Sequence, residues 1–343
     1  MKVQLLIDGT PSKVTSSIAQ AVAVGTDGVF TFEGQHDVFF PLQAAAVESD
    51  LELMTNVAIA LPRSPLHLAH AAHDLQTYSQ GRFRLGLGSQ VRAHIEKRYG
   101  SRWDKPAKQM AEWIQATKAI LDSWQSGARL DFQGDYTQHR IMSPNFNPGP
   151  NEFGVPPVLL GALGPIMTRT AGQYADGLLV MPFCSRRHFA ENTIPALQEG
   201  FRRAGRSGED FSIIAQAVVA VGETDEEISA ARNAVARLVS FYGSTPAYLP
   251  VLEVEGWADV HPELNALSKR GDFAAMRALI TDEMVDRIAV VGTPSQVADE
   301  IGARFGGHSN EVCCYFPGYD PGPELAGQLV DCLHEVAGDG HHG

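Results

Sequence analysis

The chain has 343 residues, and its 27 Lys and Arg against 40 Asp and Glu give a formal net charge of −13. Hydrophobic residues make up 44% and charged residues 20% of the chain, a composition that excludes wholesale disorder. The acidic balance argues against nucleic acid as a partner, because phosphate backbones attract clustered Lys and Arg. The length allows either two domains or one enlarged α/β barrel.

Nothing in the sequence is typical of a membrane or secreted protein. No apolar run reaches the roughly 18 residues that a membrane helix needs. The N-terminus has no charged segment followed by an apolar one, so no signal peptide is predicted. The four cysteines form no C-x-x-C pair, which favours reduced thiols over a disulfide framework. We therefore expect a cytoplasmic protein without a membrane partner.

Short apolar runs alternate with longer stretches of helical periodicity along the chain. Eight runs are predicted to be strands, at residues 3–7, 28–32, 53–61, 83–87, 155–160, 177–181, 211–221 and 311–316. Helices are expected at residues 14–24, 42–48, 65–78, 105–124, 166–174, 186–203, 224–240, from 293 onward, and at 323–336. Proline at the start of the third helix and a Thr-x-x-Glu capping box at the start of the seventh support two of these boundaries.

Two segments do not fit this alternation. Residues 129–153 are polar, irregular and rich in Pro, Gly and Asn, and residues 243–288 carry several short helices but no clear strand. We therefore predict an α/β fold, a single (β/α)8 TIM barrel over residues 1–343 with excursions at these two places. A doubly wound open sheet is the alternative. In a barrel the active site lies at the C-terminal ends of the strands, where we look for functional residues.

Polar residues follow the second predicted strand. Glu33, His36 and Asp37 come directly after residues 28–32 and would lie at the mouth of a barrel. A histidine there can donate a hydrogen bond or transfer a proton near neutral pH. The alternative is a loop histidine whose ring is satisfied by nearby backbone.

Glycine-rich turns follow two later strands. Gly86-x-Gly88 lets backbone approach a ligand, but the third glycine of a dinucleotide fingerprint is absent at Val91. Residues 161–164 (GALG) lead into a helix that begins near Pro165. The free N–H groups of such a helix start bind anions, phosphate above all. Both turns could also be plain connections.

No metal site is predicted. His67, His70 and His73 recur every three residues on one helix, without the H-E-x-x-H spacing of a zinc pair, so we expect a surface or packing role. Cys313 and Cys314 point to opposite faces of a strand and cannot readily bind one metal. The absence of a G-x-S-x-G motif disfavours an α/β-hydrolase.

Four segments, in this order, resemble the bacterial luciferase-like superfamily, and within it the branch that uses the deazaflavin coenzyme F420. They are TFEGQHD (31–37), LMTNVAIALPRSPLHLAHAAHDLQTYSQGRFRLGLGSQ (53–90), GALGPIMTRTAGQYADGLLV (161–180) and VVGTPSQVADEI (290–301). The resemblance covers residues 1–320, and its most specific part is 61–88. The family folds as a (β/α)8 barrel with an insertion, in agreement with the strand count.

The resemblance implies roles for individual residues around the cofactor ring. His36 matches the active-site histidine after the second strand, and Glu33 is the other candidate for proton transfer. A bulge with a non-prolyl cis peptide is expected behind the ring at Val57–Ala58, or one residue later at Ala58–Ile59. The extra residues 34–35 depart from the family pattern.

The resemblance also implies how the rest of the cofactor is held. Gly88, Ser89 and Gln90 match the turn beside its tail, although a carboxylate that serves as proton donor in some relatives is missing near Gln90. Gly161, Ala162, Leu163 and Gly164 match the loop that holds its phosphate. A nearby basic side chain, such as Arg92 or Arg169, would help an acidic protein to bind this anionic cofactor.

These features lead to three hypotheses. The first is an F420-dependent oxidoreductase that transfers a hydride between the deazaflavin C5 and an unidentified small organic substrate. The second is an FMN-dependent monooxygenase that receives reduced flavin from a partner reductase. The third is a barrel that binds a cofactor or partner without turnover. The family also implies a homodimer that packs through helices near the early strands.

Overall fold

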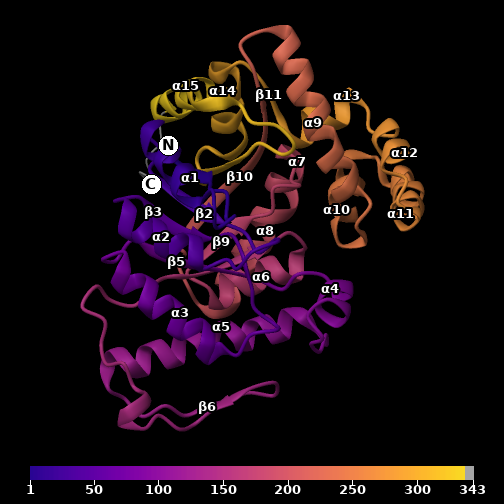
Figure 1. Cartoon of the computed structure of the whole chain (residues 1–343). Helices are drawn as coiled ribbons and strands as arrows, with labels where there is room; N and C mark the ends of the chain where they lie inside the picture. The colour runs from indigo at the N-terminus through magenta and orange to yellow at the C-terminus, as the bar shows by residue number, and fades with distance from the viewer. Residues whose placement is uncertain (337–343) are drawn as a thin grey trace.

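Eight parallel strands close into a barrel in the computed structural model, which describes residues 1–336 (Figure 1). In chain order the strands are β1 (Lys2–Leu6), β2 (Gly28–Thr31), β3 (Glu52–Thr55), β5 (Phe83–Gly88), β8 (Val158–Ala162), β9 (Gly177–Val180), β10 (Ser212–Val221) and β12 (Glu311–Tyr315). Strand β12 pairs with both β1 and β10, which closes the sheet. The predicted barrel is confirmed, and the open sheet is excluded.

Helices surround the barrel at the predicted places. They are α1 (Val14–Ala23), α2 (Phe40–Glu48), α3 (Pro65–Tyr78), α5 (Pro106–Ser126), α6 (Pro165–Tyr174), α9 (Asp225–Gly243), α14 (Pro294–Phe305) and α15 (Gly322–Glu335). The capping box of Thr224 and Glu227 is formed at the start of α9. The helix predicted at 186–203 is interrupted: α7 (Arg186–His188) and α8 (Ile194–Ala204) flank a π-helical turn, η2 (Phe189–Thr193).

Three short elements differ from the sequence-based prediction. The strand predicted at 53–61 is broken after Thr55, and its second part, β4 (Ala58–Ile59), pairs with β5. A further parallel strand, β11 (Val290–Gly292), pairs with the end of β10. A short helix, α4 (Arg92–Lys97), follows β5.

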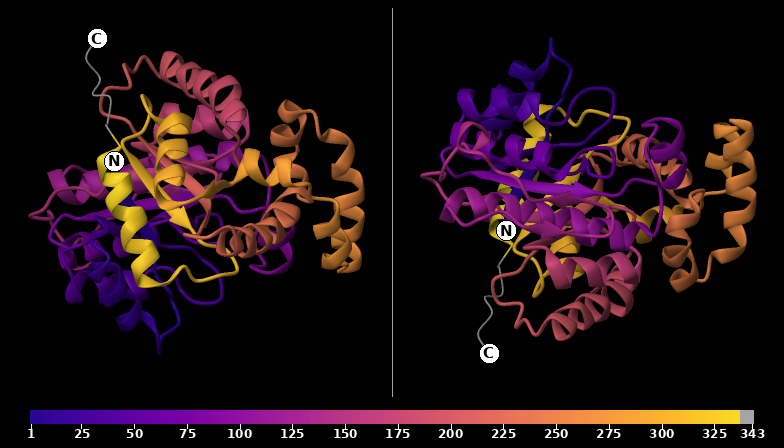
Figure 2. Two further views of the ribbon diagram at one scale, coloured as in Figure 1. Left: turned by 90° about the horizontal axis from the view of Figure 1, so that it is seen from above. Right: turned by 90° about the horizontal axis from the view of Figure 1, so that it is seen from below.

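The two predicted excursions have different structures. Residues 129–153 contain a small antiparallel hairpin of β6 (Phe132–Gln133) and β7 (Gln138–His139), followed by the 3-10 turn η1 (Pro144–Phe146). Residues 243–288 form only short helices, which stand out from the barrel at one side (Figures 1 and 2). They are η3 (Pro246–Tyr248), α10 (Leu249–Glu255), η4 (Ala258–Val260), α11 (His261–Arg270), α12 (Phe273–Ala278) and α13 (Asp282–Ile288).

The barrel interior changes from charged to apolar to polar along its axis. At the N-terminal ends of the strands, Arg84 Nη1 donates to Glu311 Oε2 over 2.7 Å, and its Nη2 donates to Glu52 over 3.2 Å. Above this ion cluster lies an apolar layer of Phe30, Met54, Leu159, Leu179, Ile214 and Cys313. A much larger core joins the barrel to its helices, and a separate cluster fills the excursion around α9 to α13.

Within residues 1–336, no helix is long and apolar enough to cross a membrane.

Candidate functional site

Three predicted site residues meet at the C-terminal mouth of the barrel. A Cβ atom placed on Gly88 would lie 2.4 Å from Val57 Cγ2, and one placed on Gly161 would lie 3.1 Å from Val57 Cγ1. The side chain of Val57 therefore occupies the space that side chains on β5 and β8 would need. Ala58 and Ile59 are buried in the main core, so their side chains do not face a ligand. The mouth thus has an apolar surface built by Val57 over two glycines.

The predicted position of the cis peptide was wrong by one residue. The cis bond joins Asn56 and Val57, rather than Val57 and Ala58 or Ala58 and Ile59. Residues 57–61 are all apolar, and the polar Asn56 precedes them, so the apolar pattern alone does not mark which peptide bond departs from the strand.

A hydrogen-bonded chain crosses the barrel below this bulge. Tyr315 on β12 donates to Gln216 Oε1 over 2.9 Å, and Gln216 on β10 donates to Asn56 Oδ1 over 3.0 Å. Burial raises the pKa of the Tyr315 phenol well above its usual value, which keeps it protonated as a donor. The sequence analysis missed these three residues. Their signal was a polar side chain at an inward position of an otherwise apolar strand.

Glu33 is the centre of a polar network at the mouth. Its Oε2 accepts hydrogen bonds from the Ile59 amide (2.8 Å) and from Arg63 Nη1 (2.6 Å), and its Oε1 accepts one from the Tyr99 hydroxyl (2.8 Å). The carboxylate is 7% exposed. Desolvation, and then the hydrogen bond to Glu33, raise the pKa of Tyr99 to about 12. This network joins the loop after β2 to β4 and to the segment after α4.

His36 lies on the same loop as Glu33 but is exposed. A Cβ atom on Gly9 would lie 4.0 Å from His36 Cβ, which places the loops after β1 and β2 side by side. Asp37 lies 3.7 Å from Arg63 and accepts a hydrogen bond from the Phe39 amide. His36 therefore has solvent access at the mouth, as a residue that exchanges protons with a bound molecule requires.

The turn after β5 uses its polar side chains locally. Gln90 has a left-handed backbone with φ of 58°, and its side-chain oxygen accepts from the Val91 amide over 3.0 Å. The Ser89 hydroxyl donates to the Gln90 carbonyl over 3.1 Å. These side-chain bonds form the turn itself, and the Gly88 carbonyl accepts from the Ala60 amide over 2.9 Å.

The turn after β8 has the features of an anion site. Gly164 is the N-cap of α6 and provides no side-chain cap. A Cβ atom on Gly164 would meet nothing within 4 Å, so there is open space beside the helix start. Ala162 and Leu163 are buried and fix the turn from below. The uncapped N–H groups and the positive end of the helix dipole suit a phosphate.

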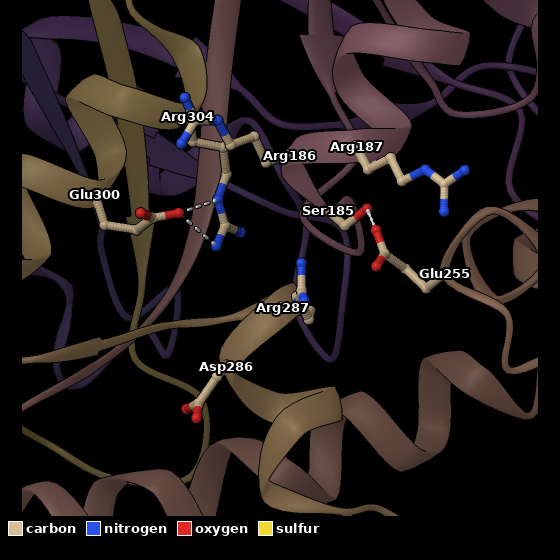
Figure 3. Close-up of a pocket in the computed structure, with 8 residues that line it drawn as sticks. All are labelled: Ser185, Arg186, Arg187, Glu255, Asp286, Arg287, Glu300 and Arg304. Carbon is tan, nitrogen blue, oxygen red and sulfur yellow. Dashed lines mark hydrogen bonds and ion pairs between the residues drawn. The ribbon is translucent and has the colours of Figure 1, made fainter.

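A cleft of about 210 Å³ contains none of the predicted site residues (Figure 3). It is lined by Ser185, Arg186, Arg187, Glu255, Asp286, Arg287, Glu300 and Arg304. Arg304 donates to the carbonyls of Ile288 (2.8 Å) and Ala289 (3.1 Å) and to Glu300 (3.2 Å). These bonds fasten α14 to the end of the helical excursion, so we assign Arg304 a structural role.

The remaining predicted clusters are used for packing. His70 and His73 lie against Trp124, with ring centroids 4.7 and 5.7 Å apart. The four cysteines, all within the described residues, are free thiols. Among residues 1–336, no group of His, Cys, Asp and Glu is arranged to hold a metal ion.

Comparisons with known proteins agree with the fold. The model of the luciferase-like monooxygenase family matches residues 6–307. The uncharacterized protein Rv1360 of Mycobacterium tuberculosis is 44% identical over 318 residues, which cover 91% of this chain and 94% of that protein. A 5,10-methylenetetrahydromethanopterin reductase of Archaeoglobus fulgidus is 30% identical over 245 residues, which cover 69% and 68% of the two chains.

A solved structure has the same fold over most of the chain. It is the coenzyme F420-dependent tetrahydromethanopterin reductase from Methanopyrus kandleri, with a TM-score of 0.80, 22% sequence identity, and coverage of 97% of this chain and 98% of that one. The luciferase-like fold predicted from the sequence is therefore confirmed, and the match of the family model to most of the chain identifies it as an oxidoreductase of the luciferase-like monooxygenase family.

Proposed function

We propose that this chain is an F420-dependent oxidoreductase that acts on a small organic substrate at the barrel mouth. One observation carries the proposal: Val57 forms an apolar surface over Gly88 and Gly161, next to the uncapped start of α6. A flat ring fits against such a surface, and a phosphate fits at such a helix start. The F420-dependent relatives support the choice of cofactor.

When bound, F420 supplies a hydride acceptor or donor at C5 of its deazaflavin ring. The residues of the chain then have three tasks. Val57 supports one ring face and leaves the other to the substrate. The N–H groups at the start of α6 hold the phosphate, and His36 exchanges a proton with the substrate at the open face.

A titration tests the choice of cofactor. Purified protein is expected to bind F420 in the micromolar range and FMN far more weakly, as measured by fluorescence quenching. The reverse order of affinities would reject the proposal.

The role of His36 has its own test. His36→Ala is expected to lower kcat by about two to four orders of magnitude, because general acid–base catalysis contributes about that much. The affinity for F420 and the melting temperature should stay unchanged, since the side chain is exposed. Asp74→Ala, on the exposed side of α3, is a control that should leave turnover intact. Unchanged turnover in His36→Ala would remove the residue from the mechanism.

The second candidate is an FMN-dependent monooxygenase supplied with reduced flavin by a partner reductase. The observation in its favour is that the α6 helix start would accept the phosphate of FMN equally well. Oxygen consumption with reduced FMN and a substrate panel tests it. Preferential FMN binding together with such consumption would replace the first proposal by this one.

A further inference from the structure

A basic segment interrupts the otherwise acidic chain immediately after β5. Residues 92–108, which we call the basic segment, contain six Lys and Arg against two Asp and Glu. The other residues carry 21 Lys and Arg against 38 Asp and Glu. Positive charge is therefore concentrated in one short stretch of the chain.

The structure fixes this segment along the rim of the barrel mouth. Arg98 Nη2 donates to the Gly34 carbonyl over 2.7 Å, in the loop that also carries Glu33 and His36. The hydroxyl of Ser101 donates to the Leu61 carbonyl over 3.3 Å, just after β4. Ile95 is fully buried and anchors α4 in the main core. The basic segment thus connects the end of β5 with the loops after β2 and β4.

Several Lys and Arg side chains of the basic segment are exposed, and only some of them have an ion-pair partner. Arg92 is 69% exposed and pairs with Glu96 on its own helix over 2.9 Å. Arg102 is 77% exposed and pairs with Asp104. Lys97 and Lys105 are exposed and have no ion-pair partner among residues 1–336. Exposed ion pairs such as Arg92–Glu96 and Arg102–Asp104 are weak, so their cations stay available to an anionic ligand.

We infer that the basic segment binds the anionic tail of the deazaflavin cofactor, beyond the phosphate site at α6. The tail of F420 carries a phosphodiester followed by glutamate carboxylates, whereas FMN ends in its phosphate. Lys and Arg bind carboxylates through charge-assisted hydrogen bonds. The inference rests on the proposed function and would give the chain a means to prefer F420 over FMN.

Binding of two ligands with the same ring separates this inference from the proposed function. The first is the deazaflavin riboside, which has no phosphate and no glutamates. The second is F420 with several glutamates. Their dissociation constants are measured by fluorescence quenching at low and high salt. Wild-type protein should bind F420 more tightly, and the advantage should shrink at high salt, because exposed charges are screened beyond about 10 Å at 0.1 M.

Reversing the charge of two lysines then tests whether the glutamate tail of F420 binds at the basic segment. Lys97→Glu with Lys105→Glu should weaken F420 binding about tenfold and leave riboside binding unchanged. Lys269→Glu with Arg270→Glu, at the exposed end of α11, changes the net charge by the same amount and is the matched control. It should leave both affinities unchanged.

Each remaining outcome has a definite meaning. Equal affinities for riboside and F420 in wild-type protein would overturn this inference together with the phosphate site at α6, although binding of both would still support a deazaflavin cofactor. Equal changes in F420 affinity in the two charge-reversal variants would overturn this inference alone and leave the proposed function standing, because the basic segment would then have no effect of its own. Failure of every deazaflavin to bind would overturn the proposed function and this inference together.

Discussion

The Glu33 carboxylate accepts hydrogen bonds from three residues at the barrel mouth. The sequence analysis offered it as a candidate for proton transfer, and that role stays a prediction. Its carboxylate accepts bonds from Ile59, Arg63 and Tyr99, which leaves little capacity for a substrate. Because one of these donors is the backbone of β4, Glu33 holds the strand that follows Val57. We therefore infer a positioning role.

Glu33→Gln tests this role. It keeps the shape of the side chain but removes the charge opposite Arg63, so the free energy of unfolding should fall by about 2 kcal/mol. The dissociation constant of F420 should rise as β4 loosens, while the shape of the pH profile of kcat stays the same. Tyr99→Phe removes one of the three bonds and should have a smaller effect in the same direction. Loss of one limb of the pH profile with unchanged stability would instead make Glu33 a proton donor.

At the scale of elements, charged side chains link the N-terminal ends of several barrel strands to one another. Arg84 on β5 bonds with Glu311 on β12 and with Glu52 on β3, and Gln4 on β1 also donates to Glu52. Glu311 is 7% exposed and Arg84 16% exposed. Buried charges of this kind depend on one another, because the loss of one leaves its partner unpaired in a poorly solvated place.

Arg84→Met should lower the free energy of unfolding by about 3 to 5 kcal/mol, measured by denaturant titration. Adding Glu311→Gln should recover part of that loss, because the uncompensated carboxylate is then gone. Lys2→Met, which removes an exposed partner of Glu52, should cost less than about 1 kcal/mol. Turnover per folded molecule should not change, since the cluster lies at the opposite end from the mouth. A loss below about 1 kcal/mol for Arg84→Met would contradict this account.

Elements with a long apolar pattern were predictable, and short ones were not. All eight barrel strands and the principal helices follow from hydrophobic periodicity, and α3 begins and ends at the predicted residues. Helix α4 was missed because it has six residues and no side-chain cap at its N-cap, Val91. Strand β11 was missed because three residues show no periodicity. The Glu33 network was missed because Arg63 and Tyr99 are 30 and 66 residues away in the chain.

At the scale of the whole molecule, apolar surface remains on the helices that follow the first strands. Phe40 and Val47 on α2 are 73% and 70% exposed, and Val22 on α1 and Tyr78 on α3 are about half exposed. Apolar side chains gathered on neighbouring elements are typical of protein interfaces. We propose that the chain forms a homodimer through α2, with an isologous contact between two copies.

Light scattering after size exclusion tests the dimer. Wild-type protein should have about twice the chain mass of 37.1 kDa, and Val47→Asp should shift the mass toward a single chain. Phe273→Asp, at an exposed apolar residue on α12, is the control and should leave the mass unchanged. A wild-type mass of one chain would reject the dimer, and a dimer that survives Val47→Asp would reject its location on α2.

The contact of Val57 with Gly88 and Gly161 has a consequence for how this protein can evolve. A methyl group at position 88 would overlap Val57, so a glycine there can be replaced only if residue 57 becomes smaller in the same lineage. A smaller residue at position 57 must therefore arise before a larger residue at position 88 can be accepted. Among homologous chains, positions 57, 88 and 161 should therefore covary, although 57 and 161 are far apart in sequence.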